Sequence, residues 1–159
     1  MAVMRAIVFL NPEMPLHLGH VGWGYEYKPG IFRYGAIEIV NSVLSKPGSD
    51  NAYFSETAPL HTALKNMGTG NHGGSGFQYM SYKIFNVPHS DFMVADKAST
   101  ARKPRGYLIT ANNCMDATYD VIVAFAKGDK NILPWPSTHW APNWWFGDIK
   151  AAEHTLPKR

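Results

Sequence analysis

The chain has little of several features that define large classes of proteins. Cys114 is the single cysteine among 159 residues, which excludes an intramolecular disulfide and favours a reducing compartment. No apolar run approaches the ~20 residues that a membrane-spanning helix needs, so we expect no transmembrane segment. The formal net charge is only +3, and no long run of Lys or Arg accompanies it. These features indicate an ordinary solvated surface, and nucleic acid is not an expected partner.

Targeting signals are also scarce. The opening residues combine one Arg with a short apolar run, but they lack a small-residue cleavage site and meet Pro12 early. They are typical of a strand rather than a signal peptide. We therefore expect a cytoplasmic protein, with export by a route that needs no signal peptide left open. The sequence does not indicate an oligomeric state.

Recognisable metal and nucleotide motifs are missing. The seven histidines include no H-x-x-x-H pair, and no carboxylate or thiol cluster accompanies His17 and His20. The stretch GTGNHGGSG lacks the G-K-[ST] ending of a phosphate-binding loop. The sequence therefore predicts no metal and no cofactor.

The length suits a single domain over residues 1–159. Apolar and β-branched runs predict strands at residues 2–10 and 78–87, and Ser90 is a plausible N-cap for a helix that follows it. Residues 46–78 are dense in Gly, Ser, Asn and Pro, which predicts a long loop with one short helix near 60–66. Residues 132–150 hold four of the five tryptophans among several prolines, which predicts an extended segment over the core or along a cleft.

Residues 19–27 and 31–40 form the clearest hairpin pattern. Both are aromatic and β-branched, and KPG separates them. A turn centred on Pro29 pairs Trp23 with Gly35, so that a bulky ring faces a glycine at the ~5 Å cross-strand spacing. The same register places His20 opposite Glu38, with both side chains on one face of the sheet.

Residues 113–127 form the clearest helix pattern, with Asn112 or Asn113 as the cap and Lys127 followed by glycine at the end. Its apolar face begins at Cys114. The pattern as a whole predicts an α+β fold in which an antiparallel sheet packs against the helix that carries the cysteine.

A cysteine in the first turn of a helix lies near unpaired backbone N–H groups, which favour the thiolate. A nucleophilic thiol also needs a base and a group that orients the base. His20 and Glu38 are candidates for these two roles, and an inert core thiol beside a hydrogen-bonded strand histidine is the structural alternative.

The order of these pieces resembles the permuted papain-like cysteine hydrolases, a group that includes the lecithin:retinol acyltransferase-like proteins and bacterial NlpC-type relatives. The pieces are GHVGW, a second hairpin strand ending near Glu38, and NNCMDATYDVI. Together they span roughly residues 15–127, and the histidine precedes the cysteine. The resemblance implies a thiol hydrolase, an amidase or peptidase, with Cys114 as nucleophile, His20 as base and Glu38 as orienting residue.

Such an enzyme passes through an acyl-thioester and needs an oxyanion donor. The Cys114 backbone N–H is the best local candidate, while Asn112 or Asn113 could help and Trp23 is a candidate substrate contact. The implied substrate is a peptide, an amide or a peptidoglycan-like molecule. Glu38 in the third position and the run NCMD favour amide hydrolysis over lipid acyl transfer.

A non-catalytic module that binds a partner or glycan through the tryptophan-rich segment is the alternative from another class.

Overall fold

The computed structural model describes residues 3–13, 17–39, 52–107 and 113–158. Its centre is a six-stranded sheet in the order β4-β3-β2-β1-β5-β6, and every neighbouring pair is antiparallel. The strands are β1 (Met4–Asn11), β2 (His20–Lys28), β3 (Ile31–Glu38), β4 (Ala52–Pro59), β5 (Ser81–Val87) and β6 (Glu153–Thr155). The predicted α+β class with an antiparallel sheet is confirmed.

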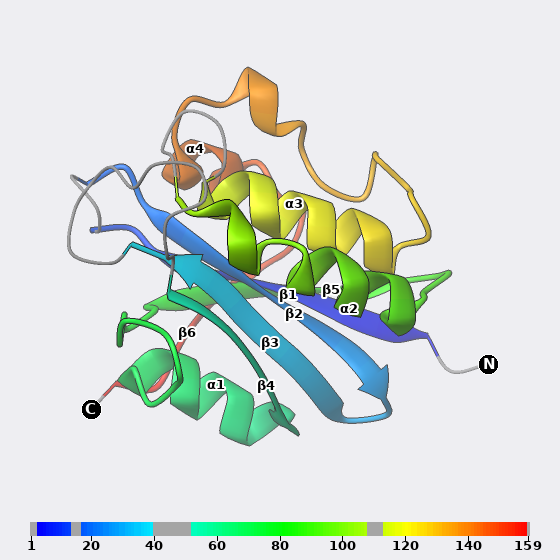
Figure 1. Cartoon of the computed structure of the whole chain (residues 1–159), viewed down its shortest axis with the longest axis horizontal. Helices are drawn as coiled ribbons and strands as arrows, with labels where there is room; N and C mark the ends of the chain where they lie inside the picture. Colours follow the sequence, from blue (N-terminus) through cyan, green and yellow to red (C-terminus); the bar gives the residue numbers. More distant parts are fainter. Residues whose placement is uncertain (1–2, 14–16, 40–51, 108–112, 159) are drawn as a thin grey trace.

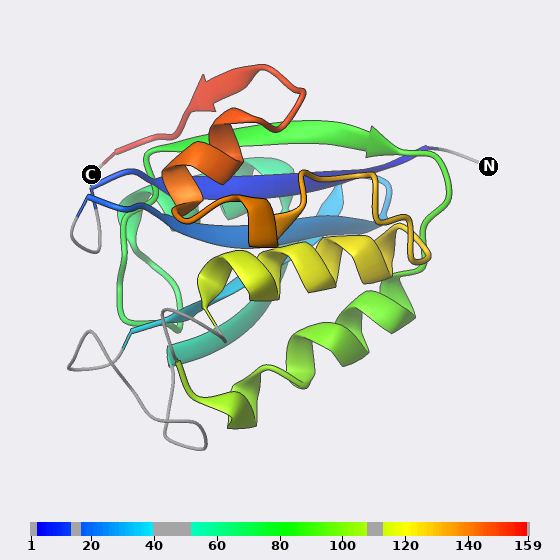
Figure 2. The ribbon, with the colours of Figure 1, turned by 90° about the horizontal axis from the view of Figure 1, so that it is seen from above.

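Helices cover both faces of this sheet (Figure 1). The helices α2 (Phe92–Thr100), α3 (Cys114–Phe125) and α4 (Pro142–Gly147) lie on one face, and α1 (Leu60–Thr69) lies on the other. Figure 2 shows α3 running along the sheet with α2 beside it. Every helix within the described ranges is too short or too polar to cross a membrane.

The central strands are buried on both sides, because each face of the sheet has its own core. Val21, Trp23 and Tyr25 alternate along β2 and pack in the core beneath α3. Phe32 and Tyr34 on β3 belong to the second core, beneath α1. Strands with two covered faces need apolar residues at successive positions, which explains the dense aromatic content of the hairpin.

The hairpin register is as predicted. Trp23 pairs with Gly35 and Gly24 with Tyr34, and the register shifts only near Lys28 at the turn. A Cβ atom at Gly35 would overlap the carbonyl oxygen of Phe54 and lie 3.1 Å from Cζ2 of Trp23. The glycine is therefore required by the close approach of the neighbouring strand and the indole.

Two segments that we expected to be irregular contain regular structure. The expected loop at 46–78 holds β4 and a helix, α1, that extends beyond the predicted 60–66; residues 46–51 lie outside the described ranges. β4 is an edge strand in which exposed and partly buried residues alternate. Its polar sequence therefore looks like that of the loop residues around it. The tryptophan-rich segment contains α4, because Pro142 occupies the first helical turn, where a missing N–H costs nothing.

The two helix caps differ in how well they were predicted. Asn113 caps α3, and its Oδ1 accepts a hydrogen bond from the Asp116 N–H at 2.9 Å. The cap of α2 is Asp91 rather than Ser90, because the Asp91 carboxylate accepts from the backbone N–H groups of Met93 and Val94. Asn113 thus fixes where α3 begins and where Cys114 lies.

Candidate active site

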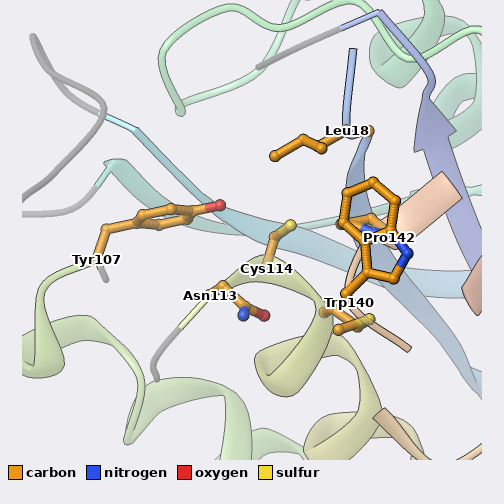
Figure 3. Close-up of a pocket in the computed structure, with 8 residues that line it drawn as sticks. Leu18, Tyr107, Asn113, Cys114, Trp140 and Pro142 are labelled. Carbon is orange, nitrogen blue, oxygen red and sulfur yellow. The ribbon is translucent and has the colours of Figure 1, made fainter. Parts of the chain in front are cut away.

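Cys114 is the first residue of α3, and its side chain is buried at the end of the sheet where β2 begins. The sulfur is hydrogen-bonded to the backbone N–H groups of Val21 and Met115 and to the Tyr107 hydroxyl. Figure 3 shows this hydroxyl pointing toward the sulfur. The Val21 N–H joins the first turn of α3 to the backbone next to His20.

Burial raises the pKa of the Cys114 thiol to about 11, although its three hydrogen bonds act in the opposite direction. The helix start alone predicted the opposite shift, toward the thiolate. Desolvation outweighs the donors because the side chain is only 1% exposed. The resting group at neutral pH is therefore a thiol.

Tyr107 is a member of the site that sequence reasoning missed. Its hydroxyl donates to the Cys114 sulfur and accepts from the Cys114 backbone N–H. Burial raises the pKa of Tyr107, so the group remains a phenol that can donate. The N–H that we expected to serve as an oxyanion donor is thus already hydrogen-bonded to Tyr107 in this structure.

His20 begins β2 and is fully buried in an aromatic setting. Its ring centroid lies 4.8 Å from that of Phe77, 5.8 Å from that of Tyr79 and 6.4 Å from that of Tyr107. Neither ring nitrogen has a hydrogen-bond partner among the described residues. Burial, helped by His72, lowers the pKa of His20 to about 3, so the imidazole is neutral.

Glu38 ends β3, and its buried carboxylate binds groups other than His20. It accepts hydrogen bonds from the Tyr79 hydroxyl at 2.6 Å, from the Ser75 N–H at 2.7 Å and from the Ser75 hydroxyl at 3.2 Å. His72 Nε2 lies 3.9 Å away. Burial raises the pKa of Glu38, while His72 and these donors lower it in part.

The expected direct pairing of His20 with Glu38 therefore needs correction. Both residues lie at the open end of the hairpin, beyond Trp23 and Gly35, which are the pair of this ladder farthest from the turn. Tyr79 connects the two, because its ring packs against His20 and its hydroxyl bonds Glu38. No hydrogen-bonded row of sulfur, imidazole and carboxylate forms among the described residues.

The remaining predicted site residues have different surroundings. Asn113 caps α3 and also lines a cavity beside the sulfur. Trp23 is fully buried in the core beneath α3, where it packs near Tyr53. Asn112 lies outside the described residues.

The cavity beside the sulfur has a volume of about 30 Å³. In Figure 3, Tyr107 lies on one side of the sulfur and Trp140 with Pro142 on the other. The lining residues come from the approach to β2, from Tyr107, from the cap and first turn of α3, and from the tryptophan-rich segment: Leu18, Gly19, Tyr107, Asn113, Cys114, Met115, Trp140 and Pro142. The sulfur thus borders a small space to which a reacting group could be admitted.

The described residues contain no group of three or more His, Cys, Asp or Glu side chains that could hold a metal ion.

Comparisons with protein-family models, curated proteins and solved structures find no match. The resemblance to the permuted papain-like hydrolases and the catalytic roles of Cys114, His20 and Glu38 therefore remain predictions.

Replacing Glu38 with alanine should lower the free energy of unfolding by about 2 to 4 kcal/mol, because it leaves the Tyr79 hydroxyl and the Ser75 N–H buried without an acceptor. Urea unfolding measures the change, with alanine at the exposed Glu13 as the matched control. A loss no larger than that of the control would show that Glu38 does not hold residues 75–79 to the sheet.

Alkylation of Cys114 by iodoacetamide should be slow at neutral pH and should keep accelerating through pH ~9, past the ordinary thiol value of about 8.5. The reason is the raised thiol pKa of about 11. Mass spectrometry of the alkylated chain at a series of pH values gives the rates. A plateau reached below pH ~8 would instead reveal a resting thiolate.

Proposed function

We propose that this chain is a cysteine hydrolase that cleaves an amide or peptide bond through a thioester on Cys114, in a permuted papain-like arrangement. The observation that carries the proposal is a fully buried imidazole whose nitrogens have no hydrogen-bond partner among the described residues, and which is linked to the buried Cys114 thiol through Tyr107. An unpartnered buried polar group costs about 1–3 kcal/mol. A catalytic role is one of the few reasons for keeping such a group.

The position of His20 supports its role as the base. Its neighbour Val21 donates to the sulfur, and Tyr107 contacts both the sulfur and the imidazole ring. A neutral imidazole has a free lone pair for the thiol proton. Because the ring makes no hydrogen bonds with the described residues, turning toward the sulfur breaks none.

The chemistry then follows in two stages. As the Cys114 sulfur attacks the carbonyl carbon, His20 accepts the thiol proton and a carbon–sulfur bond forms. His20 passes the proton to the leaving amine as the carbon–nitrogen bond breaks. A water molecule, deprotonated by His20, hydrolyses the thioester, and the proton returns to the sulfur.

The donors around the sulfur assist the first stage. Val21, Met115 and Tyr107 direct N–H or O–H groups at the sulfur, where negative charge develops as the proton leaves. Glu38 acts as a positioning residue, because it holds the Tyr79 ring against His20. A single unpaired thiol suits a reducing compartment such as the cytoplasm.

A second candidate is a non-catalytic binding module, which the tryptophan-rich segment favours. Trp135, Trp140 and Trp144 are 49%, 76% and 49% exposed. Exposed indoles stack on sugars and on other flat groups. In this function Cys114 is a core thiol, as its raised pKa would allow.

Acyl transfer to the sulfur separates the two functions. Incubation with p-nitrophenyl acetate should acetylate Cys114, detected by intact mass and peptide mapping. Glutamine at His20 should slow this acetylation at least about 100-fold, because a general base contributes about 10²–10⁴-fold. Glutamine at the exposed His61 is the matched control and should leave the rate unchanged.

Acetylation of Cys114 at the same rate in both histidine variants would contradict a base at His20. No acetylation of Cys114 in the native chain, together with glycan binding that depends on the tryptophans, would favour the binding module.

A further inference from the structure

The cavity beside Cys114 limits what can reach the sulfur. Its volume of about 30 Å³ leaves room for only a few water-sized groups, since about 10–15 Å³ on this measure holds one water molecule. Pockets that take drug-sized ligands are about 300–1,000 Å³. A large substituent therefore does not fit in the space that the sulfur borders.

The described residues that line the cavity are also uncharged. Leu18, Met115, Trp140 and Pro142 supply apolar surface. Placing a charge against these groups would remove it from water without a partner, which is costly. The lining therefore favours an uncharged, apolar group.

We propose that this cavity sets the specificity of the site for a small, uncharged acyl group, such as acetyl. The inference rests on the proposed function, because the sulfur must reach the carbonyl carbon that carries this group. The bond formed is the thioester at Cys114, and the group released is the amine. Bulky and long-chain acyl groups are excluded.

Trp140 is the specificity-determining residue in this arrangement. Its indole lines the cavity although the residue is 76% exposed, so it forms the outer wall of the cavity rather than part of the core. Removing the ring opens the cavity with little loss of buried packing. Trp144 is 49% exposed and absent from the cavity lining, which makes it the matched control.

The first test needs no turnover. Cys114 is alkylated with iodoacetamide and with an iodoacetamide that bears a naphthalene group, and the ratio of the two rates is compared with the ratio for the urea-unfolded chain. The folded chain should disfavour the bulky reagent at least about 10-fold more than the unfolded chain. Alanine at Trp140 should remove most of this selection, and alanine at Trp144 should leave it unchanged.

The second test uses p-nitrophenyl esters of acetic, butyric and hexanoic acids. Each step to a longer acyl chain should slow acylation of Cys114 by at least about 10-fold. The acylation rates of the three esters should differ less in the Trp140→Ala variant. Equal acylation by all three esters would overturn the size selection and leave the hydrolase function standing. No acylation by any ester, with size selection in alkylation intact, would overturn the hydrolase function.

Discussion

Three polar groups are buried at one end of the sheet, and the chemistry of the site depends on which hydrogen-bond partners each of them has there. The Cys114 sulfur has three donors, the Glu38 carboxylate has the Tyr79 hydroxyl and Ser75, and the His20 imidazole has no hydrogen-bond partner among the described residues. Burial favours the neutral form of each group. The protein thus keeps a neutral thiol near a neutral base instead of a preformed ion pair.

In this arrangement the thiol must lose its proton during the attack on the carbonyl carbon, because it is not ionised at rest. A resting thiolate would need stronger donors or a cation, and the described residues that line the cavity include no cation. Proton transfer to His20 as the carbon–sulfur bond forms avoids a stable buried charge. The same apolar enclosure that makes the thiol a weak nucleophile at rest also restricts which carbonyl can approach it.

Sequence reasoning predicted the features set by local pattern. The pairing of Trp23 with Gly35 followed from turn position and ring size, and the start of α3 at Cys114 followed from the Asn113 cap. It failed where distant segments compete for the same group. Tyr79 lies 41 residues from Glu38, and its hydroxyl donates to the carboxylate that we expected to bond His20.

Other features were missed for related physical reasons. Tyr107 lies in a stretch too short to classify, and only the folded chain brings its hydroxyl to the sulfur. The shift in the thiol pKa depends on burial, which the helix start does not reveal.

The most direct test of a neutral base beside a neutral thiol is the nitrogen NMR spectrum of the His20 ring in the native chain and in the Cys114→Ala variant. The imidazole should be neutral in both proteins from about pH 8 down to about pH 4, because its pKa is about 3. An imidazolium at neutral pH that becomes neutral when Cys114 is removed would contradict this prediction.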